Sequence, residues 1–137
     1  MEDLENLKSI EQIYHKGAQL QPKEIISDSP EALAQMQLNA YNAHDLEAFL
    51  EPYSEDVEIY TFPNELSSKG KDAMREGYGQ MFQNLPDLHC ELVSRVVQGN
   101  TVIDQEKVIF AKDKPASDAI AIYKIIDGKI AKVYFIQ

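Results

Sequence analysis

Cysteine is nearly absent from this chain of 137 residues, which has Cys90 alone. One cysteine cannot close a disulfide within the chain, and such cysteine usage is typical of a reducing compartment. The first ten residues, MEDLENLKSI, also lack the basic and then apolar pattern of a secretory signal peptide. We therefore expect a cytoplasmic protein.

Basic side chains are also few: 13 Lys and Arg stand against 23 Asp and Glu, which gives a net charge of −10 at pH 7. This charge repels nucleic acid and anionic lipid, and no basic tract compensates for it locally. No apolar run approaches the roughly 20 residues that a membrane span needs. We therefore expect neither nucleic acid nor a membrane as a partner, which leaves small molecules and a second copy of the chain.

The remaining composition, 44% hydrophobic and 26% charged residues, is that of an ordinary globular domain. Residues 1–29 are predicted to form an amphipathic helix over 1–20 and a linker that Pro22 and Pro30 bracket. Residues 30–137 are long enough for one domain with its own core. Three interpretations of the N-terminal helix stay open: packing on that domain, a lid or dimer arm, and a frayed tail. Its apolar positions are Leu4, Leu7, Ile10 and Ile13.

Helices are predicted first along the domain. Ser29 can cap the free N–H groups of a helix that has Pro30 in its first turn and Glu31 near the positive end of its dipole. Asp45 caps a second, short helix, and a third helix runs from Gly70 to about Asn84. The residues that share one face of the first helix are Leu33, Ala34, Gln37, Leu38 and Tyr41.

Strands dominate the second half of the chain. Two hairpin signals, Gly99-Asn100 and Asp127-Gly128, separate apolar segments of strand length. Helices followed by an antiparallel meander predict an α+β fold. The expected strands are Asp56–Phe62, Leu66–Lys69, Leu88–Gln98, Thr101–Phe110, Ala119–Ile126 and Lys129–Ile136.

A two-residue loop at Gly99-Asn100 fixes the pairing of the first hairpin, although a bulge would shift the pairing by one residue and exchange the faces. The same reasoning places Phe135 and Tyr123 of the second hairpin on opposite faces. Every face mixes apolar with polar residues, which indicates that helices around a polar cavity cover one face and a partner or solvent the other. The expected opposed pairs of the first hairpin are Arg95–Asp104, Val93–Glu106, Glu91–Val108 and His89–Phe110.

The segment from Ala40 to Phe62 is the most informative part of the chain, because its strand is unusually polar and aromatic. Tyr41, Tyr53 and Tyr60 can line one cavity, each offering a hydroxyl within an apolar wall. Such a cavity holds a small molecule. The alternative is that these tyrosines are core residues with locally satisfied hydroxyls, and Tyr53 is suited to packing the second helix against the sheet.

The order of elements resembles the nuclear transport factor 2-like superfamily, and within it the SnoaL-like and ketosteroid-isomerase-like branch. The segments that carry the resemblance are AYNAHDLEAFLEPYSEDVEIYTFP, VVQGNTVIDQEKV and YKIIDGKIAKVYFIQ, and it covers about residues 30–137. It implies a cone in which a strongly curved, mostly antiparallel mixed sheet wraps around about three helices, here with an extra N-terminal helix. It also implies a deep pocket and a homodimer formed through the outer sheet surface.

Members of this branch with known chemistry are isomerases, polyketide cyclases and dehydratases, which use an Asp or His base and Tyr or Asp hydrogen bonds to an oxyanion. The ketosteroid isomerase residues are absent here. The early helix tyrosine falls at about Gln37, the base aspartate at Thr61 or Phe62, and the protonated aspartate at Ala121 or Ile122. This departure argues against steroid isomerisation by that machinery.

Asp104 and Glu106 are the candidate catalytic carboxylates, because the resemblance turns their face of the strand into the cone. A carboxylate there loses solvent, which raises its pKa toward that of a useful base. Arg95 opposite Asp104 holds Asp104 ionised, which leaves Glu106 or His89 as the proton carrier. Two alternatives stay open: the charged residues form a salt-bridge ladder that fixes the register, and His89 is a hydrogen-bonded structural residue.

The expected substrate-binding residues orient the molecule or form the apolar wall of the cone. No metal site is expected, because the three histidines are scattered and no Cys/His spacing fits zinc. No cofactor is expected, since the chain has neither a Gly-rich phosphate loop nor a dinucleotide fingerprint. The substrate-binding candidates are Gln37, Tyr41, Tyr60, Phe62, Arg95, Phe110 and Phe135.

Two functions fit these residues. The first is a cofactor-independent isomerase, cyclase or dehydratase that acts on a small apolar or mixed organic molecule, with Glu106 or Asp104 moving the proton. The second is a module that binds such a ligand without turnover, or a dimer that serves interaction. The missing ketosteroid isomerase residues favour the second.

Overall fold

The structure, a computed structural model, describes residues 29–137, so the predicted N-terminal helix and linker lie outside the described part of the chain. Within it the elements follow the predicted order, and the α+β prediction is confirmed. The first strand begins at Tyr53 rather than at Asp56. The elements are α2 (Pro30–Ala43), α3 (Leu46–Leu50), β1 (Tyr53–Thr61), β2 (Glu65–Lys69), α4 (Lys71–Asn84), β3 (His89–Gln98), β4 (Thr101–Ile109), β5 (Ser117–Ile126) and β6 (Lys129–Ile136).

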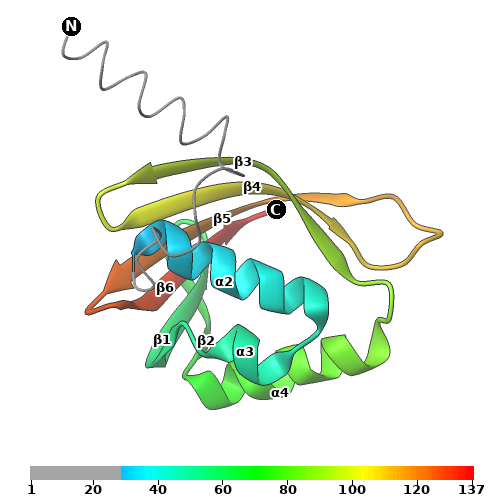
Figure 1. Ribbon diagram of the computed structural model, residues 1–137, viewed down its shortest axis with the longest axis horizontal. Coiled ribbons are helices and arrows are strands. Elements are labelled where there is room, and N and C mark those ends of the chain that lie inside the picture. The colour runs from blue at the N-terminus through cyan, green and yellow to red at the C-terminus, as the bar shows by residue number, and fades with distance from the viewer. Residues whose placement is uncertain (1–28) are drawn as a thin grey trace, which may run out of the picture.

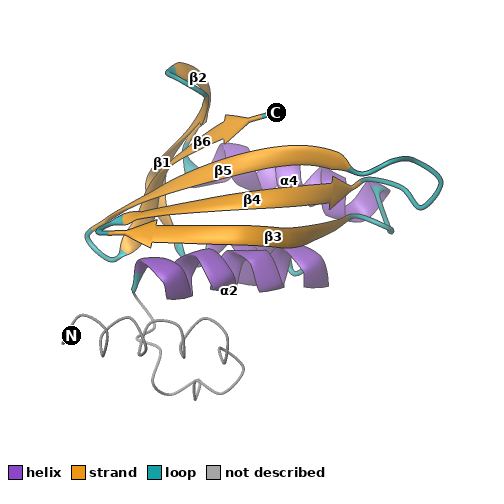
Figure 2. Ribbon diagram, turned by 90° about the horizontal axis from the view of Figure 1, so that it is seen from above, coloured by secondary structure: helices purple, strands orange, loops and turns teal. Residues whose placement is uncertain are grey.

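The strands form one sheet in the order β2-β1-β6-β5-β4-β3. β1 and β6 run parallel, and every other neighbouring pair runs antiparallel. The sheet curls around the helices, which lie on its concave side (Figure 1). α2 runs along the edge that β3 forms (Figure 2). This is the curled, mixed sheet around three helices that the resemblance implied.

Short polar side chains set the helix ends, as the sequence predicts. The Ser29 hydroxyl accepts a hydrogen bond from the backbone N–H of Ala32 at 3.1 Å, and Asp45 Oδ1 accepts one from Ala48 at 3.2 Å. Between the two helices His44 adopts a left-handed backbone conformation, φ 56°, which ends α2. The chain can therefore turn sharply and bring α3 against the core.

The core lies between the concave face of the sheet and the helices. Phe49 and Leu50 of α3 are each 1% exposed. The ring centroid of Phe49 lies 5.9 Å from that of Tyr41 in α2 and 4.7 Å from that of Tyr78 in α4. Because α3 is wedged between its two neighbours, its aromatic contacts define the space that remains under the sheet.

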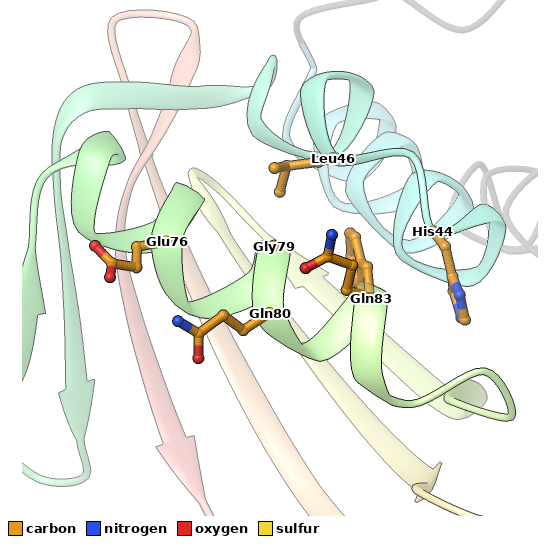
Figure 3. A pocket seen from close by; sticks show the side chains of 7 residues that line it. His44, Leu46, Glu76, Gly79, Gln80 and Gln83 are labelled. Atoms are coloured by element: carbon orange, nitrogen blue, oxygen red, sulfur yellow. The ribbon is translucent and has the colours of Figure 1, made fainter.

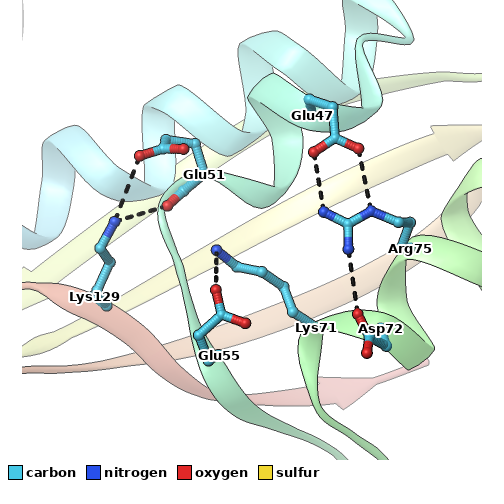
Figure 4. Close-up of polar contacts among 7 residues, drawn as sticks. All are labelled: Glu47, Glu51, Glu55, Lys71, Asp72, Arg75 and Lys129. Carbon is cyan, nitrogen blue, oxygen red and sulfur yellow. Dashed lines mark hydrogen bonds and ion pairs between the residues drawn. The ribbon is translucent and has the colours of Figure 1, made fainter.

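Ion pairs join the helices and strands on the outside of this core (Figure 4). Arg75 of α4 donates to both carboxylate oxygens of Glu47 in α3, at 3.1 and 3.0 Å. Lys129 of β6 donates to the backbone carbonyl of Glu51 at 2.9 Å. Water screens such exposed pairs strongly, so they orient α3 and α4 more than they stabilise the fold.

β3 contains a bulge that corrects part of the predicted pairing. Arg95 lies opposite Asp104 as expected, but the register shifts at Val93, so Leu92 and not Val93 lies opposite Glu106. Beyond the bulge the faces of β3 are exchanged relative to the prediction. Cys90 is therefore buried, and His89, which pairs with Ile109 rather than Phe110, is exposed on the outer face.

The second hairpin also has an irregular register, where Ala131 of β6 is the extra residue between the pairs Ile125–Ile130 and Lys124–Lys132. The prediction that Tyr123 and Phe135 lie on opposite faces is therefore wrong. Tyr123 lies opposite Val133, and both are buried on the concave side. These two irregularities decide which side chains reach the interior of the cone.

Candidate functional site

A cavity of about 320 Å³ lies between the concave face of the sheet and the three helices. Its wall contains seven aromatic rings. One comes from each of α2, α3 and α4, and the other four come from strands or from residues at strand ends. Four of these rings are tyrosines: Tyr41, Tyr53, Tyr78 and Tyr123. The site therefore combines an apolar wall with several phenol groups.

Glu106 is the single charged side chain among the described residues that line this cavity. It projects from β4 and is 6% exposed. Burial, and then the negative charge of Asp104, raise the pKa of Glu106 to about 7, while a hydrogen bond from Cys90 and the charge of Arg95 oppose the rise. A carboxyl with this pKa exchanges its proton readily near neutral pH.

Asp104, two residues earlier on the same face of β4, is fully buried but does not line the cavity. Arg95 Nε and Nη2 donate to its two carboxylate oxygens at 2.7 and 2.9 Å. Arg95 Nη1 also donates to Gln35 Oε1 of α2 at 2.8 Å. Both acceptor oxygens of Asp104 are thus engaged, so this carboxylate is a fixed charge behind Glu106 rather than an open proton carrier.

A hydrogen-bonded chain crosses the floor of the cavity. Tyr53 Oη donates to Gln37 Oε1 at 2.9 Å, and Gln37 Nε2 donates to Tyr123 Oη at 3.0 Å. Because the Tyr123 oxygen accepts this bond, its own proton is free to be donated elsewhere. Gln37 therefore fixes Tyr123 as a hydrogen-bond donor at the wall of the cavity.

Tyr41 and Tyr78 present two more phenol groups to the same space. Neither hydroxyl has a hydrogen-bond partner among residues 29–137, and both rings are packed by the α3 aromatic contacts. Burial, and then the charge of Glu106, raise the pKa of Tyr78 to about 12. Burial also raises the pKa of Tyr41. These phenols therefore stay protonated and act as donors.

The structure brings together some of the residues that the sequence singled out. Glu106, Gln37, Tyr41, Phe110 and Phe135 all line the cavity. Gln37 and Tyr41 lie on α2, Glu106 lies on the face of β4 that the sequence analysis turned inward, Phe110 directly follows β4, and Phe135 lies on β6. The prediction that these residues serve a ligand remains a prediction.

Four other candidates lie outside the cavity. Arg95 belongs to the buried pair with Asp104, and His89 is exposed beyond the bulge. Tyr60 lies on the outer face, where it donates to Glu58 Oε1 at 2.6 Å and stacks on Tyr134. Phe62 is 50% exposed at the end of β1. The outward positions of Tyr60 and Phe62 follow the strand alternation, since Tyr53, Ile59 and Thr61 are the β1 residues that line the cavity.

Sequence reasoning missed several residues that line the cavity, among them Tyr78, Cys90 and Tyr123. Tyr78 lies on α4, and nothing in the sequence separated a cavity wall from ordinary helix packing. Cys90 and Tyr123 were placed on the wrong faces by the two register errors. Burial, and then the charge of Glu106, raise the pKa of the Cys90 thiol, so it is a poor nucleophile.

A second hollow lies on the surface between the α2–α3 turn and α4 (Figure 3). Its polar lining residues Glu76, Gln80 and Gln83 are exposed to solvent, so nothing desolvates them. Among residues 29–137 no three His, Cys, Asp or Glu side chains gather as a metal site would require. None of the helices in this part of the chain has the length and hydropathy of a membrane span.

The chain is similar to several solved structures. An uncharacterized cystatin fold protein from Novosphingobium aromaticivorans is 25% identical, with 80% of this chain and 98% of that one covered and a TM-score of 0.74. A candidate ketosteroid isomerase from Kribbella flavida is 21% identical over 78% and 76% of the two chains, with a TM-score of 0.62. A candidate polyketide cyclase from Sinorhizobium meliloti is 16% identical over 85% and 99%, with a TM-score of 0.65. The last two similarities show the fold alone.

No curated protein matches the chain. The family described as SnoaL-like domain matches residues 34–133, which is most of the chain and includes every element from α2 to the middle of β6. Together with the curled sheet and its three helices, this match identifies the domain. The chain belongs to the SnoaL-like domain family, within the nuclear transport factor 2-like superfamily.

Proposed function

We propose that the protein is an enzyme that moves a proton on a small organic molecule held in the cavity, with Glu106 as the proton carrier. The observation that carries this proposal is the position of Glu106. It lines the cavity, it is 6% exposed, and its pKa is raised to about 7. At that pKa both protonation states are populated near neutral pH, as a group that takes and later returns a proton requires.

The chemistry fits a carbon acid next to a carbonyl group. The Glu106 carboxylate takes the α proton, the C–H electron pair forms the double bond of an enolate, and negative charge gathers on the carbonyl oxygen. Hydrogen bonds from Tyr123 and Tyr41 stabilise that oxygen. In a β,γ-unsaturated ketone, Glu106 then returns the proton to the γ carbon, which is isomerisation. In a β-hydroxy ketone, the enolate expels the β hydroxyl group, which takes the proton from Glu106 and leaves as water, which is elimination.

Ligand binding without turnover is the second candidate function. One observation favours it: by the resemblance, the ketosteroid isomerase positions fall at about Gln37, at Thr61 or Phe62, and at Ala121 or Ile122, none of which supplies a carboxyl or a phenol. The two functions differ in whether Glu106 acts on a bound molecule, so a proton-exchange experiment separates them.

The test measures exchange of α protons for deuterium in small ketones such as benzylacetone and tetralone, incubated with the protein in D₂O and followed by NMR. General-base catalysis contributes about 10² to 10⁴ in rate, so Glu106→Gln is expected to lower any protein-dependent exchange by at least the smaller factor. Glu91→Gln, an exposed carboxylate on β3, is the matched control and should keep the rate. Equal exchange in wild type and Glu106→Gln would remove Glu106 from the mechanism.

We also propose that a second copy of the chain covers the outer face of the sheet. One row of apolar side chains crosses all six strands there, because its members lie opposite one another from strand to strand. Val96 in this row is 59% exposed and Leu66 is 51% exposed. A continuous apolar row with exposed members at both ends favours an interface, and an isologous pairing covers it on both copies. The row consists of Val96, Ile103, Ile122, Tyr134, Tyr60 and Leu66.

Light scattering after gel filtration tests the pairing. Wild type is expected to elute as a dimer and Ile103→Lys as a monomer, because the lysine places a charge in the middle of the row. Met36→Lys on α2 is the matched control, since Met36 is 38% and Ile103 36% exposed and Met36 lies away from the sheet face. A monomeric wild type contradicts the proposal.

A further inference from the structure

We propose that the cavity selects an uncharged ketone of one or at most two rings and rejects carboxylates, phosphates and steroid-sized molecules; this inference rests on the proposed function of the same site. It goes beyond the proposed function because it specifies the charge, the polar group and the size of the molecule that the cavity binds. Three independent properties of the wall carry it: its charges, its hydrogen-bond donors and its volume.

The charges of the wall exclude an anion. No Lys, Arg or His occurs among the described residues that line the cavity, and Glu106 is the one acid there. Arg95, the cation whose charge acts on Glu106, has its Nε, Nη1 and Nη2 atoms engaged by Asp104 and Gln35. A carboxylate or phosphate would enter a largely buried space without a counter-charge and beside a carboxyl group. The unfavourable free energy of desolvating the anion would exceed the favourable free energy of its aromatic contacts.

The hydrogen-bonding groups favour an acceptor on the ligand. Tyr123 accepts from Gln37, so its own proton is free for another acceptor, and Tyr41 and Tyr78 have no hydrogen-bond partner among residues 29–137. Three phenol groups that can donate thus line one space. A carbonyl oxygen on the ligand would accept their hydrogen bonds.

The volume limits the number of atoms. At the ~30 Å³ that a water molecule occupies in the liquid, a cavity of about 320 Å³ has room for roughly ten waters and hence for a ligand with a similar number of heavy atoms. That is one ring with a short side chain, and two fused rings are the upper limit. A fused tetracyclic skeleton exceeds it. The aromatic wall, which includes Phe49, Phe110 and Phe135, suits a flat ring.

The test compares three probes of nearly equal shape with the full-length protein at pH 8, by saturation-transfer NMR and calorimetry. The probes are benzylacetone, hydrocinnamate, which replaces the ketone methyl group by a negative oxygen, and the primary amine that replaces the carbonyl group of benzylacetone. Benzylacetone is expected to bind at least tenfold more tightly than hydrocinnamate, and the cationic amine, which the Glu106 carboxylate attracts, is expected to bind more tightly than hydrocinnamate as well. Progesterone, as the size probe, is expected to give no transfer.

Two variants locate the binding and its charge selectivity. Ala119→Leu extends a side chain from the buried wall of the cavity and is expected to abolish benzylacetone binding, while Ala116→Leu in the exposed loop before β5 keeps it. Glu106→Gln removes the carboxylate and is expected to narrow the gap between benzylacetone and hydrocinnamate. Thermal melting of each variant checks that it is folded.

The outcomes separate this inference from the proposed function. Hydrocinnamate or progesterone binding as tightly as benzylacetone overturns the inference, and so does the lack of transfer to all probes, or an amine that binds more weakly than hydrocinnamate. Benzylacetone that binds selectively but shows no Glu106-dependent deuterium exchange supports the inference and contradicts the proposed enzymatic step. Exchange that depends on Glu106 without selective binding contradicts the inference alone.

Discussion

Asp104 and Glu106 show how neighbours on one strand face acquire different chemistry. Both are buried carboxylates on β4. Arg95 binds both oxygens of Asp104, and the negative charge of Asp104 acts on Glu106. Glu106 has no cationic partner in the wall, so burial and the charge of Asp104 raise its pKa. The pair Arg95–Asp104 therefore sets how readily Glu106 holds a proton.

Removing one member of that pair should move the pKa of Glu106 in opposite directions. Asp104→Asn removes the negative charge and leaves Arg95, so the pKa of Glu106 is expected to fall toward its ordinary value. Arg95→Gln leaves Asp104 uncompensated, so the pKa is expected to rise above about 7. Titration of the side-chain carboxyl carbon of Glu106 by NMR measures both shifts.

The double variant Arg95→Gln/Asp104→Asn is the control for that titration. It removes both charges, so the pKa of Glu106 should lie between those of the single variants. Breaking a buried pair costs about 3 to 5 kcal/mol, and the double variant avoids the unpaired charge. If the pKa of Glu106 shifted in the same direction in both single variants, packing and not charge would control that pKa.

At the scale of elements, the sequence predicted the helices, the strands and both hairpin turns, because these depend on local signals. Ser29 and Asp45 cap helices, and Gly99 and Gly128 allow the turns. The register beyond each turn depends on how the sheet curves around α2 and α3, which is a tertiary property. No Gly or Pro marks Val93 or Ala131 as the extra residue in its strand.

The consequences for the site follow residue by residue. The Arg95–Asp104 pairing was right because it lies between the turn and the bulge, whereas His89 was placed inside because it lies beyond the bulge. Glu106 was placed correctly because β4 itself is regular over this stretch. The inward position of Tyr123 was not predicted, because Tyr123 lies beyond the register irregularity at Ala131. A strand face is thus predictable only up to the first bulge.

One side chain joins α2 to the edge strand in place of a further strand. Asn42 Nδ2 donates to the carbonyl of Cys90 at 2.9 Å, and the N–H of Cys90 donates to Asn42 Oδ1 at 2.8 Å. Asn42→Ala leaves both backbone groups of Cys90 unpaired, which is expected to lower the free energy of unfolding by about 1 to 3 kcal/mol. Urea unfolding measures the loss, and amide hydrogen exchange at Cys90 should accelerate.

Asn39→Ala is the matched control on the same helix. Asn39 Oδ1 accepts only an exposed hydrogen bond from Gln35 Nε2, so its loss should change stability little and leave exchange at Cys90 unaltered. If both variants lose the same stability, helix propensity rather than the contact with β3 explains the effect.

At the scale of the whole molecule, the two faces of the curled sheet carry different kinds of side chain. The concave face encloses phenols and Glu106, and the convex face carries the apolar row from Val96 to Leu66. A flat sheet would leave no enclosed space, and Glu106 would then meet solvent. The curvature of the sheet is therefore what desolvates Glu106.

This desolvation should appear in the pH dependence of global stability. Glu106 has an ordinary pKa near 4.5 in the unfolded chain and about 7 in the folded protein, so the folded state holds the proton more tightly. Its contribution to the free energy of unfolding is fully present below pH 4.5 and is lost as the pH rises through 7. At 1.36 kcal/mol per pKa unit, the loss is on the order of 3 kcal/mol.

The glutamine of the Glu106→Gln variant cannot ionise, so the free energy of unfolding of this variant should not show this loss as the pH rises. It is therefore expected to gain stability relative to wild type between about pH 5 and about pH 8, by up to the full contribution of Glu106. Urea unfolding of the two proteins across that range measures the difference, which cancels the titration of the other carboxylates. Glu91→Gln, whose carboxylate is exposed on β3, should follow wild type at every pH. A difference between wild type and Glu106→Gln that does not vary with pH would mean that folding leaves the proton affinity of Glu106 unchanged, and the enclosed cavity would then be too wet to support its role as a base.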